Sequence, residues 1–122
     1  MRILLVEDDT LNAELFRAVL EPEGHVVELE VTGPAGRARA LAEPFDLIVL
    51  DVQLPGLRGD SLCRALRATG LRTPIIAVTA SAMPDQIAAL SEAGFDECLN
   101  KPIEPATLRD VVRRFDAAGR AL

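Results

Sequence analysis

Four predicted strands of this sequence are each followed by polar side chains, and the chemistry of these side chains differs from strand to strand. They are Glu7, Asp8 and Asp9 after Ile3–Val6, Asp51 after Leu47–Leu50, Thr79 after Pro74–Val78, and Lys101 after Glu97–Asn100. A carboxylate placed where a buried strand emerges has lost part of its hydration, and a cation beside it restores the lost stabilisation. The pattern therefore favours a site that combines acidic, hydroxyl and cationic groups.

Each of these residues taken alone also has a purely structural explanation. Asp51 could cap the turn made by Leu54, Pro55 and Gly56, and the acids at 7–9 could begin a helix, whose macrodipole favours negative charge at its start. Capping does not explain why four of five predicted strands end in acids, a hydroxyl and a lysine. The combination indicates a functional site.

Lys101 is the only lysine of a chain that contains twelve arginines. Since the sequence uses arginine wherever a surface cation suffices, this one position has kept a compact ammonium group. Such a point charge suits contact with a small anion. Composition bias explains the arginines and leaves Lys101 as a candidate anion-binding residue.

The composition predicts a single domain over residues 1–122, with a core at about 1–117 and a short C-terminal tail. Only four residues are aromatic, so the core must be aliphatic, and the net charge of −6 argues against direct nucleic-acid binding. No apolar run approaches the ~20 residues of a membrane span and no signal peptide is visible, which predicts a cytoplasmic protein without membrane contact. Cys63 and Cys98 lack metal-like spacing and are expected to be buried thiols.

Periodicity predicts five strands that alternate with five helices. The strands are expected at Ile3–Val6, His25–Glu30, Leu47–Leu50, Pro74–Val78 and Glu97–Asn100. The helices are expected from the acids at 7–9 to about Pro22, from Thr32 to about Ala42, from about Asp60 to Ala68, from Pro84 to Ala93, and from Pro105 onward. The residues expected to face the core from the second and fourth helices are Ala35, Ala38, Ala42, Ile87 and Leu90. His25 is expected in a turn or at the surface.

Connections of this length force parallel pairing, with helices on both faces of the sheet. Strands 1, 3 and 4 are apolar throughout and belong in the centre, while strand 2 alternates and strand 5 is short, so these two belong at the edges. The expected fold is therefore α/β and doubly wound, a flavodoxin-like (βα)5 arrangement with strand order 2-1-3-4-5. In that order the carboxyl ends of strands 1, 3, 4 and 5 share one rim, beside the switch point where such sheets bind ligands.

That rim would bring Glu7, Asp8 and Asp51 together, and three carboxylates repel one another without a cation. Their oxygens are hard ligands of the kind that Mg²⁺ takes, and magnesium commonly shares a phosphate oxygen. The site is therefore expected to hold a divalent ion and a phosphoryl group, with Asp51 as the nucleophile. Lys101 and the metal would neutralise the phosphoryl oxygens, and Thr79 would donate a hydrogen bond to one of them.

With these residues in view, the chain resembles the receiver domains of two-component response regulators. The matching motifs are VEDD at 6–9, DVQLPGLRG at 51–59, VTA at 78–80 and KP at 101–102, in the family's order and spacing. The resemblance covers residues 1 to about 117. It implies a signalling switch that accepts a phosphoryl group on Asp51 from a histidine kinase or a histidine phosphotransfer protein and signals through protein contacts. The only activity it implies is self-catalysed phosphoryl transfer and autodephosphorylation.

The resemblance also implies roles for single residues. The magnesium ligands would be Glu7, Asp8, Asp51 and the backbone carbonyl of Gln53. Thr79 would be the switch hydroxyl, the backbone N–H of Ala80 and the Lys101 ammonium would contact the phosphate, and the Lys101–Pro102 bond would be cis. The partners it suggests are an unidentified output protein and a second copy of the chain, bound through the face of the fourth and fifth helices.

Two positions depart from the family pattern. Gln53 stands where many relatives carry Met, which leaves its carbonyl intact and changes the mouth of the site. Cys98 stands where the family usually has Tyr, Phe or His, whose ring enters the space that the switch hydroxyl vacates. A thiol carries no ring, so the loop and helix at 80–93 are expected to be the output element rather than the fifth strand. The alternative is that Phe95 supplies the ring.

Three other functions share some of these features. A phosphatase of the haloacid dehalogenase type needs a second Asp two residues after the nucleophile, where this chain has Gln53. A nucleotide-binding protein needs a Gly-rich phosphate loop, whereas the turn after the first strand is acidic. The third is a degenerate receiver that serves as a constitutive binding or dimerisation module, and the complete set of site residues argues against it. A single-domain regulator is the favoured organisation.

Overall fold

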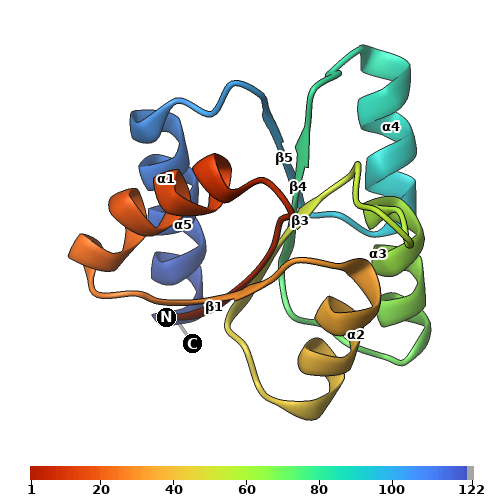
Figure 1. The fold of residues 1–122 in the computed structure, drawn as a ribbon, viewed down its shortest axis with the longest axis horizontal. Coiled ribbons are helices and arrows are strands. Elements are labelled where there is room, and N and C mark those ends of the chain that lie inside the picture. The colour runs from red at the N-terminus through yellow and green to blue at the C-terminus, as the bar shows by residue number, and fades with distance from the viewer. Residues whose placement is uncertain (121–122) are drawn as a thin grey trace.

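The computed structural model describes residues 1–120, which contain one parallel five-stranded sheet in the order β2-β1-β3-β4-β5 (Figure 1). The strands are β1 (Arg2–Val6), β2 (Val26–Glu30), β3 (Leu47–Asp51), β4 (Ile75–Thr79) and β5 (Glu97–Asn100). The helices are α1 (Thr10–Leu20), α2 (Gly33–Ala42), α3 (Gly59–Ala68), α4 (Pro84–Ala93) and α5 (Pro105–Arg120), and a short 3-10 helix, η1 (Glu21–Glu23), follows α1. The predicted fold class and strand order are confirmed. Residues 121 and 122, the end of the predicted tail, lie outside the described residues.

Helices cover both faces of the sheet: α1 and α5 lie on one face, and α2, α3 and α4 on the other (Figure 1). In β1, Ile3 and Leu5 pack with α1 and α5, whereas Leu4 and Val6 pack on the opposite side. Because each central strand buries both of its faces, its sequence is apolar throughout instead of alternating. None of the helices within the described 1–120 is long and apolar enough to cross a membrane.

Asp9 is the acid that begins α1. Its Oδ1 accepts hydrogen bonds from the backbone N–H groups of Leu11 (2.9 Å) and Asn12 (3.2 Å). A helix start leaves its first N–H groups unpaired, and this cap satisfies two of them. The capping explanation of the acidic run therefore holds for Asp9 and leaves Glu7 and Asp8 with another role.

The second helix packs against the sheet through glycine. The residues that α2 buries are Gly33, Gly36 and Ala40. The prediction that Ala35, Ala38 and Ala42 form its packing face is wrong, because none of these three is buried. A Cβ atom at Gly36 would lie 2.7 Å from Cγ2 of Val6, so the helix lies closer to β1 than an alanine at that contact allows.

The fourth helix is buried only at its C-terminal end. Leu90 and Ala93 are its buried residues, as predicted for Leu90, but Ile87 is 41% exposed, so its predicted inward position is wrong. All residues from 84 to 89 are exposed. Only the C-terminal end of the helix therefore packs on the sheet, and Ile87 lies in its exposed N-terminal part.

Two predictions about single side chains are also corrected. His25 lies in the turn before β2, as expected, but it is buried, with Nδ1 2.9 Å from the N-terminal amine of Met1, so the surface alternative is wrong. Cys63 is fully buried, whereas Cys98 is only partly buried, because it lies on the edge strand β5.

Candidate functional site

The carboxyl ends of β1, β3, β4 and β5 lie along one rim of the sheet, and the strand register aligns their polar residues. Asp51 is paired with Val78 across β3 and β4, and Thr79 with Asn100 across β4 and β5. The backbone N–H of Lys101 donates to the carbonyl of Thr79 at 2.8 Å. Hydrogen bonding of the parallel strands thus positions the acid, the hydroxyl and the lysine relative to one another.

Asp51 is the centre of this site and is only 3% exposed. Its Oδ2 lies 2.7 Å from Nζ of Lys101, and its Oδ1 accepts a hydrogen bond from the backbone N–H of Gln53 at 2.9 Å. Both carboxylate oxygens are therefore held by donors. The carboxylate is oriented and ionised, as a nucleophile must be.

Glu7 and Asp8 complete an acidic cluster around Asp51. One carboxylate oxygen from each of the three residues lies within 4.8 Å of the others, with Glu7 and Asp51 buried and Asp8 exposed. Both oxygens of Glu7 lack a hydrogen-bond partner among the described residues, and the nearest cation, Nζ of Lys101, is 4.0 Å from Oε1. A buried carboxylate without donors is costly unless a cation completes its shell. The donor set therefore fits a hard divalent cation such as magnesium.

The charges of the cluster shift its pKa values. Burial raises the pKa of Glu7 to about 7, and the neighbouring Asp51 carboxylate adds to this rise. Burial acts on Asp51 in the same direction, but contacts with Glu7, Lys101 and the Gln53 N–H outweigh it and lower the pKa of Asp51. Burial would lower the pKa of Lys101, yet Asp51 and Glu7 raise it. At neutral pH the site combines an ionised Asp51–Lys101 pair with a Glu7 whose raised pKa favours uptake of a proton.

The hydroxyl of Thr79 is engaged by its own loop. Oγ1 donates to the carbonyl of Ser81 and accepts from the N–H of Ser81, both at 3.1 Å, and Thr79 is 5% exposed. Ala80, between them, is exposed. To reach a group bound on Asp51, the hydroxyl must leave its donation to Ser81.

Gly59 allows the start of α3 to lie directly against the end of β3. Its N–H donates to the carbonyl of Val52 at 2.9 Å. A Cβ atom at this position would lie 2.3 Å from the carbonyl oxygen of Asp51 and 2.8 Å from Cα of Val52, so no other residue fits without a shift. The glycine that ends the 51–59 motif therefore sets the position of the acid at its beginning.

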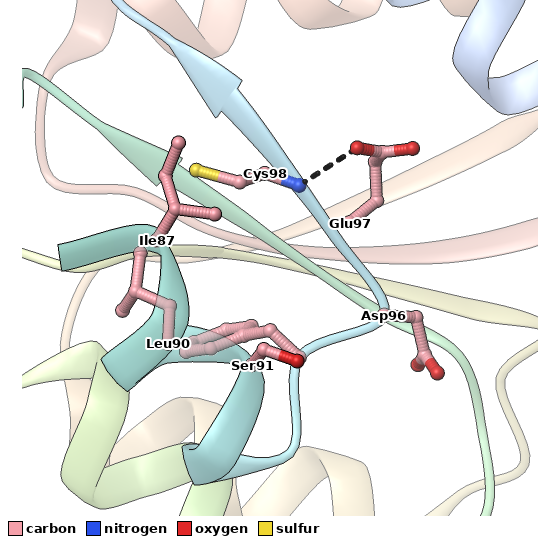
Figure 2. Close-up of a pocket in the computed structure, with 7 residues that line it drawn as sticks. Ile87, Leu90, Ser91, Asp96, Glu97 and Cys98 are labelled. Carbon is pink, nitrogen blue, oxygen red and sulfur yellow. Dashed lines mark hydrogen bonds between the residues drawn. The ribbon is translucent and has the colours of Figure 1, made fainter. Parts of the chain in front are cut away.

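The remaining predicted residues lie around this centre. The Lys101–Pro102 bond is cis. Gln53 is exposed and presents its N–H to Asp51, while its carbonyl remains a predicted ligand. Cys98 is outside the cluster, and its side chain points from β5 toward Ile87 of α4 in a pocket of about 170 Å³ (Figure 2).

Sequence reasoning missed two partners of the site. They are the Gln53 N–H, which donates to Asp51, and the backbone of Ser81, which occupies the Thr79 hydroxyl. The signal for the second was the threonine itself, because Ser and Thr hydroxyls often bond the backbone two residues on. The donation from Gln53 has no side-chain signature, because any non-proline residue provides an N–H.

The sequence matches the model of the response regulator receiver domain over residues 3–113. The chain belongs to this family. Its members are modules of two-component signalling, and the relatives of this chain are response regulators and histidine kinases.

Three curated relatives differ widely in length. Response regulator ORR41 of rice (Oryza sativa subsp. japonica) is 34% identical, over 97% of this chain and 96% of that protein. The response regulator PmrA of Pseudomonas aeruginosa is 41% identical, and the match covers 100% of this chain but 56% of PmrA. The hybrid signal transduction histidine kinase G of Dictyostelium discoideum is 39% identical over 94% of this chain, which spans only 4% of that kinase.

Solved structures agree with the fold. The chemotaxis response regulator CheY4 of Vibrio cholerae has a TM-score of 0.87 at 28% identity, and the similarity covers 93% of this chain and 97% of that one. The receiver domain of the sensor histidine kinase PA1611 from Pseudomonas aeruginosa has a TM-score of 0.84 at 36% identity, covering 93% and 95%. That structure has a magnesium ion coordinated in the active-site cleft.

Proposed function

We propose that the chain is a phosphorylation-dependent signalling switch in which Asp51 accepts a phosphoryl group. The observation that carries this proposal is the environment of Asp51, a buried carboxylate 2.7 Å from the only lysine and beside the carboxylates of Glu7 and Asp8. An ionised, oriented acid next to a cation and a hard-cation cluster has the parts that phosphoryl transfer needs. Membership of the receiver family supports the same role.

In the proposed step, an oxygen of the Asp51 carboxylate attacks the phosphorus of a phosphohistidine or a small acyl phosphate. A new P–O bond forms, giving an acyl phosphate on Asp51, while the bond from phosphorus to the donor atom breaks and its electron pair stays on the donor. Autodephosphorylation is the attack of water on the same phosphorus, which regenerates the carboxylate and releases inorganic phosphate. The buried site limits the access of water to this bond.

The residues around Asp51 have distinct roles in this step. Lys101 would neutralise charge on the phosphoryl oxygens, and its ion pair with Asp51 at 2.7 Å supports this role. Thr79 would donate to a phosphoryl oxygen once it leaves Ser81, and the Ala80 N–H would donate beside it. Glu7, Asp8, Asp51 and the Gln53 carbonyl would hold magnesium, which supplies charge neutralisation for the transferring group when bound.

We propose a histidine kinase or a histidine phosphotransfer protein as the donor, since histidine kinases are among the relatives that contain a similar segment. Output is proposed to pass through protein contacts, with another protein or with a second copy at the α4–α5 face. Residues 1–122 would act as one receiver domain in the cytoplasm. The net charge of −6 disfavours direct nucleic-acid binding.

Mass spectrometry of the chain after incubation with acetyl phosphate and Mg²⁺ tests the proposal. We expect one added phosphoryl group on Asp51 and none on Asp51→Asn. Labelling of the Asp51→Asn variant, or no labelling of the wild type, would refute a phosphoacceptor role and favour the degenerate binding module.

A further inference from the structure

The attachment of α4 is uneven along its length. At its C-terminal end, Leu90 and Ala93 are buried, and Nε of Arg67 donates to the carbonyl of Gly94 at 3.0 Å. At its N-terminal end, Met83 provides no side-chain cap and residues 84–89 are all exposed. One end of the helix is therefore fixed, and the other has little to hold it against the sheet.

A single side-chain hydrogen bond reaches the N-terminal half of α4 from the rest of the described chain. It runs from the hydroxyl of Ser81 to Oε1 of Gln86. Ser81 is the residue whose backbone N–H and carbonyl both bond the Thr79 hydroxyl. The three residues thus form one connected chain from the buried hydroxyl beside Asp51 to the first turns of the helix.

Thr79 cannot change its partner without affecting this chain. When its hydroxyl turns to an oxygen bound on Asp51, the partly buried peptide groups of Ser81 lose their partner, and a buried unpaired polar group is costly. Ser81 must then move to find other partners, and its own hydroxyl moves with it. The hydrogen bond from Ser81 to Gln86 therefore stabilises the same position of Ser81 as its hydrogen bonds with the Thr79 hydroxyl.

We propose that the Ser81–Gln86 hydrogen bond is a latch that holds the N-terminal half of α4 in the unphosphorylated arrangement and sets how readily Thr79 is released. The inference rests on the proposed phosphorylation of Asp51 and adds its regulation. Ser81 and Gln86 are positioning residues, since they act through Thr79 and do not touch the reacting atoms.

A latch that stabilises one state lowers the population of the other, so a ligand of the released state binds more weakly while the latch is present. Removing one ordinary hydrogen bond should therefore tighten the binding of a phosphoryl mimic by about 2- to 10-fold, if the bond contributes the usual net amount. It should also lower the protection of α4 amides in the absence of the mimic.

The test measures beryllofluoride affinity in saturating Mg²⁺ by calorimetry, together with amide exchange at residues 87–89 of the unliganded chain. Gln86→Ala should bind the mimic more tightly and exchange faster than the wild type. Gln86→Glu, which keeps an acceptor oxygen for Ser81, should stay close to the wild type. Ser81→Ala should reproduce the effect of Gln86→Ala, and the double variant should add nothing further.

The possible results distinguish a failure of the latch proposal from a failure of the proposed phosphoacceptor role. If the wild type binds beryllofluoride and Asp51→Asn does not, but Gln86→Ala binds it equally or more weakly, the latch is wrong and the site stands. If Asp51→Asn binds beryllofluoride as well as the wild type, the proposed function fails and the latch fails with it.

Discussion

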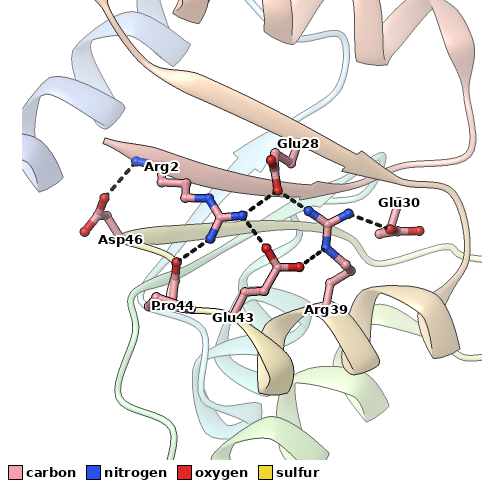
Figure 3. Close-up of polar contacts among 7 residues, drawn as sticks. All are labelled: Arg2, Glu28, Glu30, Arg39, Glu43, Pro44 and Asp46. Carbon is pink, nitrogen blue, oxygen red and sulfur yellow. Dashed lines mark hydrogen bonds and ion pairs between the residues drawn. The ribbon is translucent and has the colours of Figure 1, made fainter.

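The two edges of the sheet are held in different ways. At the β2 edge, two arginines join β1, β2 and the C-terminal end of α2 in a network of ion pairs (Figure 3). At the β5 edge, no side-chain hydrogen bond of the described residues joins α4 to β5, and a pocket lies between them (Figure 2). A structure held by several shared partners resists displacement of any one element, whereas an element with one or two contacts can move.

Arg39 and Arg2 are the centres of the β2-edge network. Arg39 pairs with Glu30 at 3.1 Å and with Glu43 at 2.6 Å, and it also contacts Glu28. Arg2 pairs with the same Glu28 at 2.9 Å and with Glu43. Glu28 and Glu43 each contact both arginines. A side chain that one partner has already ordered loses less conformational entropy when it pairs with a second, so the network should stabilise the fold more than isolated surface pairs would.

The pocket at the β5 edge has about 170 Å³ of space and is lined by residues of α4, of β5 and of the segment between them. Among the residues that line it, Ile87 is exposed and Cys98 is partly buried, whereas Leu90 and Phe95 are buried. No side-chain hydrogen bond joins α4 to β5 across this pocket among residues 1–118, whose side chains the structure describes. We therefore expect phosphorylation to change the position of α4 more than that of the elements at the β2 edge.

Truncating the apolar anchor of α4 should have the largest effect. Leu90→Ala removes a side chain that is 7% exposed, and we expect it to lower the free energy of unfolding by about 2–4 kcal/mol. Ile87→Ala, less than one helical turn away and 41% exposed, should cost less than about 1 kcal/mol. Urea unfolding measures both. Equal losses would show that α4 is held along its whole length, and would contradict the conclusion that only its C-terminal end is firmly attached.

Breaking the ion-pair network should have a smaller but distinct effect. Arg39→Ala removes the partner of three glutamates, and we expect a loss of about 2 kcal/mol, which shrinks as salt rises because the pairs are partly exposed. Arg37→Ala, exposed on the same helix, is the matched control and should change stability by less than about 0.5 kcal/mol. If the two variants unfold at the same urea concentration, the network does not hold this edge.

Magnesium should give a still smaller stabilisation. At five times its Kd, the ion should add about 1 kcal/mol by mass action. Because Glu7 has a pKa of about 7, it is protonated below that value and competes with the metal, so the gain should be larger at pH 8 than at pH 6. Thermal melting with and without Mg²⁺ at the two pH values measures it.

Two neighbouring acids provide the control for this prediction. Asp8→Asn removes a member of the cluster and should lose most of the magnesium effect. Asp9→Asn keeps a good helix cap on α1 and should retain it. A similar loss in both variants would indicate general charge screening instead of a specific site.

The central strands and the site residues could be predicted from the sequence, because their residue types indicate burial or charge directly. Apolar runs that end in acid or hydroxyl residues located β1, β3 and β4, and the order of motifs aligned Asp51 with Lys101. Packing through glycine gave no hydrophobic signal, which is why the buried face of α2 was assigned to its alanines and not to Gly33 and Gly36. Ile87 carries the signal of a core residue, but its exposure depends on how α4 packs in the whole fold.

Contacts between residues far apart in sequence were the least predictable. Arg2 meets Glu43 across 41 positions and has no periodic relation to it. Ser81 and Gln86 are close in sequence, yet a hydrogen bond between a loop serine and an exposed glutamine cannot be distinguished from solvation without coordinates. The site could be predicted because the carboxyl ends of parallel strands lie at one rim of the sheet. The side-chain contacts at the two sheet edges could not, because they depend on the positions of residues far apart in the fold.

Amide exchange with and without beryllofluoride, in the presence of Mg²⁺, tests the difference between the two edges most directly. We expect protection to change most in residues 80–93, less in Glu97–Asn100, and least in Val26–Glu30 and Gly33–Ala42. A larger change in Glu97–Asn100 than in residues 80–93 would contradict the assignment of output to α4. A change at the β2 edge as large as that at α4 would contradict the conclusion that the β2 edge is held more firmly than α4.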